Sequence, residues 1–237
     1  MVKLGVAQIA LTNDIGANMV KIHNYASEAA GAEADVLCFP ECSLTGYKRD
    51  FSEIDGKEIL KALEALQKTA AEKRITLIVG TPYPESDRLY NAALVISADS
   101  QLKYFKNNLT EFDRQYFAEG RERLTFDVKG VKCGVIICRD QNYPALAREY
   151  AQVGAAVLFL PSAHYYPPHE ARLKLDKNRA LPVARAVEGS FFVAKANAVG
   201  SQGDYVSLGH SMIVSPGGSI VCEADSADED ILYHEAG

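Results

Sequence analysis

The sequence predicts an α/β fold in which helices cover the outer faces of a mixed β-sheet system. Short apolar segments rich in β-branched residues alternate with amphipathic segments of helical period. Several strand-like segments follow one another closely enough to form hairpins. At 237 residues, 48% of them apolar, the chain can build one large core. We therefore expect a single layered α/β sandwich domain over residues 1–237, without a linker or repeat.

The predicted strands are short runs of apolar and β-branched residues that end at turn residues. In chain order they cover residues 3–9, 36–39, 76–81, 90–97, 101–105, 123–128, 131–137, 156–160, 191–196, 211–214 and 219–222. Lys129-Gly130 and Pro216-Gly217-Gly218 indicate tight turns between consecutive strands.

Four helices are predicted between these strands, over residues 18–30, 57–73, 143–152 and 173–188. The second has the clearest pattern, because its apolar residues recur on one face: Ile59, Leu60, Leu63, Leu66 and Ala70. Asp55 and Glu58 predict a start of the capping-box type for it. Asn142 is the expected N-cap of the third helix, with Pro144 in the first turn. The fourth is expected to be helical in spite of Pro182.

Composition excludes several classes of protein. The formal net charge of -6 and the scattered basic residues argue against nucleic-acid and membrane partners. No segment approaches the roughly 18 consecutive apolar residues that indicate a spanning helix, and the first residues do not resemble a signal peptide. The five cysteines are odd in number and form no CxxC pair, so neither a disulfide framework nor a zinc cage is expected. We expect a cytoplasmic protein.

Cys138 is the first candidate for a catalytic residue. The strand predicted at 131–137 runs directly into it, and a helix is predicted to begin about five residues later. Such a strand–turn–helix layout exposes a side chain at a bend and places backbone N–H groups and a helix N-terminus beside it. We expect these surroundings to acidify the thiol and leave it accessible. The alternative is a small apolar filler at a strand end.

Two charged residues also follow apolar strands, where active sites of α/β sheets are assembled. Glu41 comes after the strand at 36–39, and Lys106 directly after the strand at 101–105. Each of them alone is also explained as a solvated strand terminus. None of the five histidines lies in a recognisable motif, and His164 with His169 lacks a third ligand for a metal. No metal site is expected.

Taken together, the segments around Glu41, Lys106 and Cys138 resemble the nitrilase superfamily, or carbon–nitrogen hydrolases, with its Glu–Lys–Cys triad. The matching segments are Pro40-Glu41 with Gly46-Tyr47, Tyr104-Phe105-Lys106-Asn107-Asn108-Leu109, and Gly134-Val135-Ile136-Ile137-Cys138-Arg139-Asp140. Supporting matches lie at 185–188, 196–200, 209–211 and 215–218, so the resemblance covers almost the whole chain in order. It implies a four-layer α-β-β-α sandwich and a homodimer or higher homo-oligomer.

The chain departs from the family pattern after the lysine and after the cysteine. Many members carry a second glutamate ahead of the Tyr-Phe pair, where this chain has Asp113, with Glu111 as an alternative. Ala145 stands where the family often has glutamate. The resemblance therefore leaves Asp113 as a possible fourth catalytic or positioning residue.

The resemblance implies Glu41 as general base, Lys106 as oxyanion stabiliser and Cys138 as nucleophile, with a thioester intermediate and no cofactor. Arg139 through its backbone N–H, together with Tyr47, His164 and Tyr165, is expected at the oxyanion site or substrate pocket; for Tyr165 and its neighbour Tyr166 a packed loop is the alternative.

The expected substrate is a small linear amide or N-carbamoyl amine, because the Cys-x-Asp-Gln segment at 138–141 is similar to that of N-carbamoylputrescine amidase-like enzymes. Two other functions stay open. One is a nitrilase that makes an acid and ammonia from a nitrile. The other is a catalytically idle binding protein.

Overall fold

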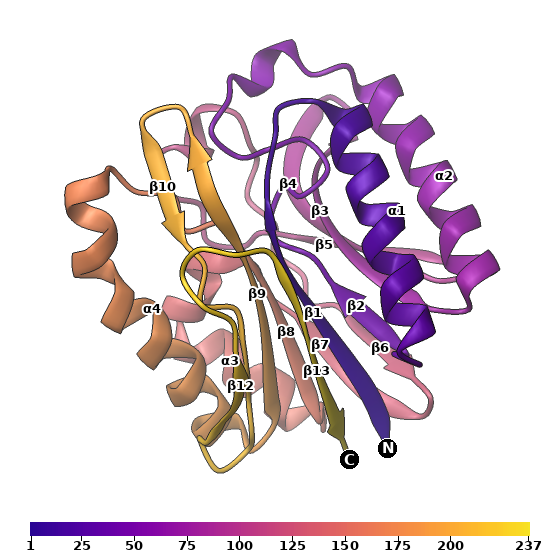
Figure 1. Cartoon of the computed structure of the whole chain (residues 1–237), viewed down its shortest axis with the longest axis vertical. Coiled ribbons are helices and arrows are strands. Elements are labelled where there is room, and N and C mark those ends of the chain that lie inside the picture. Colours follow the sequence, from indigo (N-terminus) through magenta and orange to yellow (C-terminus); the bar gives the residue numbers. More distant parts are fainter.

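A computed structural model describes residues 1–237 as four layers, two β-sheets face to face with a pair of helices outside each. Helices α1 (Ile15–Gly31) and α2 (Gly56–Lys73) lie together on one side, and α3 (Pro144–Gln152) and α4 (Pro168–Gly189) on the other (Figure 1). The predicted α-β-β-α sandwich is confirmed. No helix is both long and apolar enough to cross a membrane.

The first sheet has the order β5-β4-β3-β2-β1-β13 and the second contains β6-β7-β8-β9-β11-β12, with β10 paired to the far part of β9. The first-sheet strands are β1 (Val2–Ala10), β2 (Val36–Cys38), β3 (Thr76–Glu85), β4 (Arg88–Ile96), β5 (Gln101–Phe105) and β13 (Asp230–Ala236). The others are β6 (Thr125–Val128), β7 (Val131–Val135), β8 (Val157–Ser162), β9 (Phe192–Gln202), β10 (Tyr205–Leu208), β11 (Met212–Val214) and β12 (Ile220–Glu223). The two sheets join where β1 pairs with β9, at Ile9 with Ala198 and Ala10 with Val199.

Successive side chains along the strands of the first sheet belong to two different hydrophobic clusters, one on each face of the sheet. On β1, Leu4 and Val6 belong to the cluster between the sheets, whereas Ala7 and Ile9 belong to the cluster under α1 and α2. Successive strand residues point to opposite faces, so a sheet covered on both faces needs apolar residues at consecutive positions. This explains why the central strands read as continuous apolar runs.

Helix α2 forms where the apolar periodicity predicts it. The side chain of Asp55 caps its first turn by accepting from the Lys57 N–H. Ile59, Leu63, Leu66 and Ala70 are buried beneath it as predicted, whereas Leu60 is exposed and does not belong to the buried face. The reciprocal bond of a capping box from Glu58 does not form.

Several elements of the structure differ from those predicted from the sequence. Asn142 does not cap α3, because it ends a 3₁₀ helix (Cys138–Asn142) and Tyr143 precedes the helix without a side-chain cap. Pro144 at the start of α3 has no N–H to satisfy, which reduces the need for a cap. Helix α4 begins five residues earlier than predicted, at Pro168. Strands β10 and β13 were not predicted, and β13 pairs antiparallel with β1 along most of its length.

Candidate active site

The strands that precede the three candidate residues run in the same direction. β1, β2 and β3 are parallel, and β5 points the same way because two antiparallel pairings separate it from β3. In the second sheet β7, β8 and β9 are parallel, and β9 is parallel to β1. The carboxyl ends of β2, β5, β7 and β8 therefore meet at one edge of the sandwich, and Glu41, Lys106 and Cys138 follow three of them.

Cys138 sits at a strained bend. Its φ is 46°, in the left-handed region that non-glycine residues seldom adopt, and the 3₁₀ helix starts at this residue. Its side chain is 6% exposed. A non-glycine residue held in this conformation costs about 1–2 kcal/mol, so the surrounding contacts must hold the thiol in this position.

Glu41 is held in a tight turn that crosses β3. The next residue, Cys42, has a φ of 51°. Gly80 on β3 leaves room for this turn, since a Cβ there would lie 2.4 Å from the Pro40 carbonyl oxygen and the Cys42 nitrogen. Glu41 is completely buried, and its Oε1 accepts from the amide of Asn91 at 2.8 Å.

Lys106 lies between two carboxylates. Its Nζ is 2.6 Å from Glu41 Oε1 and 2.6 Å from Asp113 Oδ2, and all three side chains are buried. Thr110 donates its backbone N–H to Asp113 Oδ2, and Tyr47 donates its hydroxyl to Asp113 Oδ1. The structure thus places Asp113 against the lysine. Glu111 is exposed.

The environments of the two carboxylates push their pKa values in opposite directions. Burial raises the pKa of Glu41 and outweighs the attraction of Lys106. At Asp113 burial acts the same way, but Lys106 and the Thr110 hydrogen bonds hold the pKa below its usual value. Burial would lower the pKa of Lys106, yet the neighbouring Glu41, Tyr47 and Asp113 raise it well above the ordinary value. Lys106 is therefore a permanent cation, Asp113 an anion, and Glu41 the more basic carboxylate.

The sequence-based expectation of an acidified thiol is wrong. Burial, followed by the negative charge of Glu41, raises the pKa of Cys138, and Lys106 only partly offsets them. The backbone N–H of Ala163 donates to Glu41 Oε2 at 3.1 Å and also favours the thiolate of Cys138. Sulfur and carboxylate thus flank the same N–H, and the resting thiol needs a base to remove its proton.

Asp140 links the turn at Cys138 to the loop that follows Lys106. Its carboxylate accepts from the backbone N–H of Ile137 at 3.0 Å, from the backbone and side chain of Asn108 at 2.8 and 2.9 Å, and from the Tyr104 hydroxyl at 2.8 Å. Burial raises its pKa, which these hydrogen bonds oppose. Asp140 fixes the segments on either side of the site relative to each other.

The residues predicted for the pocket lie in different surroundings. Tyr47 reaches the site through Asp113, and the Arg139 side chain is exposed. His164 is buried, with its Nε2 3.2 Å from the Gln141 amide. Burial, with Lys195, Lys106 and Lys177 adding to it, lowers the pKa of His164 well below its ordinary value, so the ring is neutral.

The side chains of Tyr165 and Tyr166 also lie in different surroundings. Tyr165 packs into the core under α1 and α2, and its buried hydroxyl has no hydrogen-bond partner in the chain. Tyr166 is the neighbour whose phenol is influenced by Cys138 and Glu41. The role of Tyr165 in a pocket stays a prediction.

Asn91 and Ala163 are parts of the site that the sequence did not predict. Asn91 on β4 donates its side-chain amide to Glu41, and its backbone carbonyl accepts from the Lys106 N–H at 2.9 Å. An asparagine within an otherwise apolar strand is a signal that could have found it. Ala163 acts through its backbone alone, which no residue type reveals.

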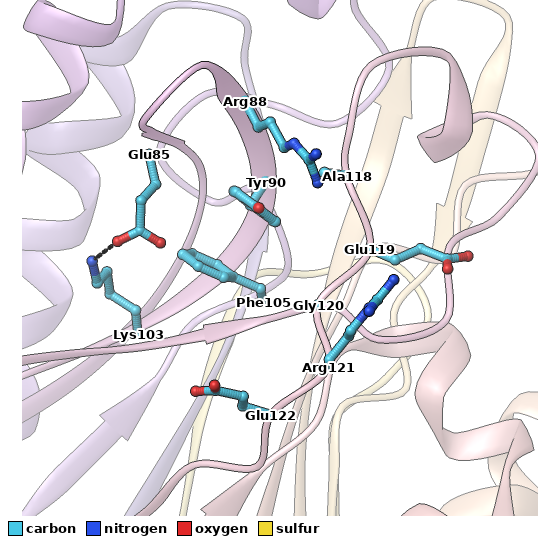
Figure 2. A pocket seen from close by; sticks show the side chains of 10 residues that line it. All are labelled: Glu85, Arg88, Tyr90, Lys103, Phe105, Ala118, Glu119, Gly120, Arg121 and Glu122. Carbon is cyan, nitrogen blue, oxygen red and sulfur yellow. Dashed lines mark hydrogen bonds and ion pairs between the residues drawn. The ribbon is translucent and has the colours of Figure 1, made fainter.

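A cavity of about 850 Å³ lies outside this site, at the free edge of the first sheet (Figure 2). Three carboxylates and three cations line it around the stacked rings of Tyr90 and Phe105: Glu85, Glu119, Glu122, Arg88, Lys103 and Arg121. None of the three candidate residues lines it. No group of three or more His, Cys, Asp or Glu side chains in the chain is arranged to hold a metal ion.

The chain is similar to known proteins over almost its whole length. The family model described as carbon-nitrogen hydrolase matches residues 3–236. The chain is 31% identical to the 2-oxoglutaramate amidase of Bacillus subtilis, over 91% of this chain and 83% of the amidase. It is also 31% identical to an omega-amidase of Mus musculus, over 98% of this chain and 87% of that protein.

A longer relative matches over part of its length. The chain is 33% identical to the glutamine-dependent NAD(+) synthetase of Aquifex aeolicus, but it spans only 42% of that protein. Among solved structures, an amidase from Nesterenkonia sp. superimposes with a TM-score of 0.87 at 23% identity, over 98% of this chain and 89% of the amidase. That likeness shows the fold.

Proposed function

The chain belongs to the carbon–nitrogen hydrolase family, in its amidase branch, and from that premise we propose that it hydrolyses a small linear amide or N-carbamoyl amine through a thioester on Cys138. The observation that supports this most is the convergence of a buried thiol, a carboxylate of raised pKa and a permanent cation at one edge of the sandwich.

Glu41 acts as the general base in this proposal. It takes the proton of the Cys138 thiol, whose pKa burial raises, and the thiolate attacks the carbonyl carbon of the amide. Glu41 then gives the proton to the departing amine as the carbon–nitrogen bond breaks. It next takes a proton from water as the water attacks the thioester, and it returns this proton to the departing sulfur of Cys138, which releases the acid and restores the free thiol.

Lys106 stabilises the oxyanion of the tetrahedral intermediate. An ammonium has three N–H donors, of which Glu41 and Asp113 engage two, so one remains for the substrate oxygen. The backbone N–H of Arg139 at the start of the 3₁₀ helix is the proposed second donor. Each such donor is typically worth about 3–4 kcal/mol in the transition state. Asp113 keeps the lysine charged and in place.

The relatives support an amide rather than a nitrile as substrate. Two of the relatives named above are a 2-oxoglutaramate amidase and an omega-amidase. The N-carbamoyl amine is kept as the second possibility within the same chemistry. We also propose a cytoplasmic homodimer, to whose interface the half-exposed Val187 on α4 contributes an apolar side chain.

Trapping the acyl-enzyme tests the proposal directly. Intact-mass spectrometry after exposure to a library of amides and N-carbamoyl amines should show an added acyl or carbamoyl group, and peptide mapping should place it on Cys138. The Cys133→Ala protein, which lacks a buried thiol of the same strand region, should form the same adduct. An adduct on another residue, or hydrolysis of nitriles but not amides, would contradict the proposal.

The pH dependence of kcat/KM tests whether Glu41 is the general base. Glu41 must be ionised to take the thiol proton, so activity should fall as the pH falls through its raised pKa, and the acid limb should lie above 4.5, the ordinary glutamate value. Glu41→Gln should lower kcat by about 10²–10⁴-fold. Glu111→Gln, at an exposed carboxylate, is the control and should behave as the parent. An acid limb at or below 4.5 would remove Glu41 from the role of base.

A further inference from the structure

Lys48 is a cation held in an aromatic cage beside the proposed catalytic residues. Its Nζ lies 4.3 Å from the ring centroid of Tyr205, 4.5 Å from that of Phe112 and 5.4 Å from that of Tyr47. These rings come from the hairpin of β9 and β10, the loop after Lys106 and the loop after β2. Three separate segments thus fix the position of one ammonium group.

The cage adjoins the site through Tyr47. The ring of Tyr47 also has the Nζ of Lys106 at 5.8 Å from its centroid, so both ammonium groups contact one aromatic side chain. Burial lowers the pKa of Lys48, while the charges of Glu41, Asp113 and Cys138 act in the opposite direction. Lys48 is half-buried, and its ammonium group is therefore within electrostatic reach of the reacting groups while still partly open to solvent.

No side chain of the protein neutralises Lys48. Lys106 pairs with two carboxylates, whereas no Asp or Glu oxygen lies within ion-pair distance of the Lys48 ammonium. Lys103 shows the usual arrangement for comparison. Its Nζ lies 4.8 Å from the Tyr83 ring centroid. It also forms an ion pair with Glu85, which Figure 2 shows. A half-buried cation without an anion, next to a catalytic site, is suited to an anionic group that arrives with the substrate.

We propose that Lys48 binds a carboxylate at the end of the substrate remote from the bond that is cleaved, an inference that rests on the proposed amide hydrolysis. The aromatic rings fix the ammonium group in advance, so little side-chain entropy is lost when the carboxylate binds. The carboxylate can belong to the acyl part, as in the monoamide of a short dicarboxylic acid, or to the leaving amine, as in an N-carbamoyl amino acid. Both share one chemistry, a small amide with a terminal carboxylate.

The first test compares charged and neutral substrates. For the acyl side, kcat/KM for glutaramate is compared with pentanamide; for the amine side, N-carbamoyl-β-alanine is compared with propylurea. The charged member of one pair should be preferred by about 10–100-fold, the range of a hydrogen bond to a charged group. Which pair shows the preference tells where the carboxylate lies. No preference in either pair overturns the proposal, and hydrolysis of the neutral amide alone leaves the proposed function intact.

Variants then assign the preference to Lys48. Lys48→Met keeps the apolar stem but not the charge, and should bring the ratio of charged to neutral substrate close to one, mainly through KM. Lys48→Arg should retain most of the preference and shows that the cage still folds around a cation. Lys103→Met removes a lysine from a second aromatic site and should leave both the ratio and the activity as in the parent. An unchanged ratio in Lys48→Met would overturn the proposal.

An equilibrium measurement separates this inference from the proposed function. Calorimetry with glutarate needs no turnover, and its Kd should rise about tenfold or more in Lys48→Met relative to the parent and to Lys103→Met. Equal affinity in all three proteins excludes Lys48 as the carboxylate site even if amides are hydrolysed. Weakened binding in Lys48→Met in a protein that hydrolyses no amide would instead disprove the proposed function and keep the anion site.

Discussion

Cys138→Ala is expected to lower kcat by about 10⁴–10⁶-fold against any substrate of the enzyme, the range seen when a catalytic nucleophile is removed. Without sulfur no thioester can form, and Glu41 and Lys106 can only assist a direct attack by water. Steady-state kinetics with the amide identified by mass spectrometry measures the loss.

The fold should survive this change. Alanine keeps the Cβ at the residue with φ 46°, so the backbone strain is the same, and only one buried atom is lost. We expect the free energy of unfolding to change by about 1 kcal/mol. Cys133→Ala is the matched control, since Cys133 is also buried but lies on β7, and it should keep its activity. A kcat of Cys138→Ala close to that of Cys133→Ala would contradict the thioester mechanism.

Lys106→Met should affect stability and activity together. The substitution leaves Glu41 and Asp113 buried without the cation that both contact at 2.6 Å. Removing one partner of a buried ion pair typically costs about 3–5 kcal/mol. Loss of the proposed oxyanion donor should lower kcat by at least about 10²–10³-fold in the protein that remains folded.

The destabilisation of Lys106→Met should depend on pH. Without the lysine, burial and mutual repulsion raise the pKa of Glu41 further, and a carboxyl group with a raised pKa in the folded state is best tolerated below its unfolded pKa. The variant should therefore recover stability relative to the parent as the pH falls toward 4.5, and lose it as the pH rises. Chemical denaturation at several pH values measures this trend.

Lys103→Met is the control for that experiment. Its ion pair with Glu85 is partly exposed to solvent, and such pairs contribute about 0–1 kcal/mol. If Lys106→Met were no less stable than Lys103→Met at neutral pH, the three buried charges could not form the coupled group described here.

The sequence predicted most helices and strands because their signals are local. Burial of one face repeats every 3.6 residues in α2, and β-branched runs bounded by turn residues mark most strands of both sheets. The strands it missed, β10 and β13, are short or carry charged residues such as Asp230 and Glu235. β10 is held by hairpin pairing with the adjacent β9, whereas β13 is held by pairing with β1, at the other end of the chain.

The sequence by itself predicted the family and the sandwich fold, through its resemblance to the carbon–nitrogen hydrolases, and Glu41, Lys106 and Cys138 as candidate catalytic residues, since each follows an apolar strand within a recognisable motif. The tertiary structure alone decided which carboxylate meets the lysine, that Asn91 supports Glu41, that the thiol is less acidic than its turn suggested, and that Lys48 lies in an aromatic cage. The reason is physical. Strand ends and helix faces depend on neighbours a few residues away. Contacts between residues 50 to 157 positions apart, and the burial that shifts a pKa, depend instead on the direction and register of the strands in two packed sheets.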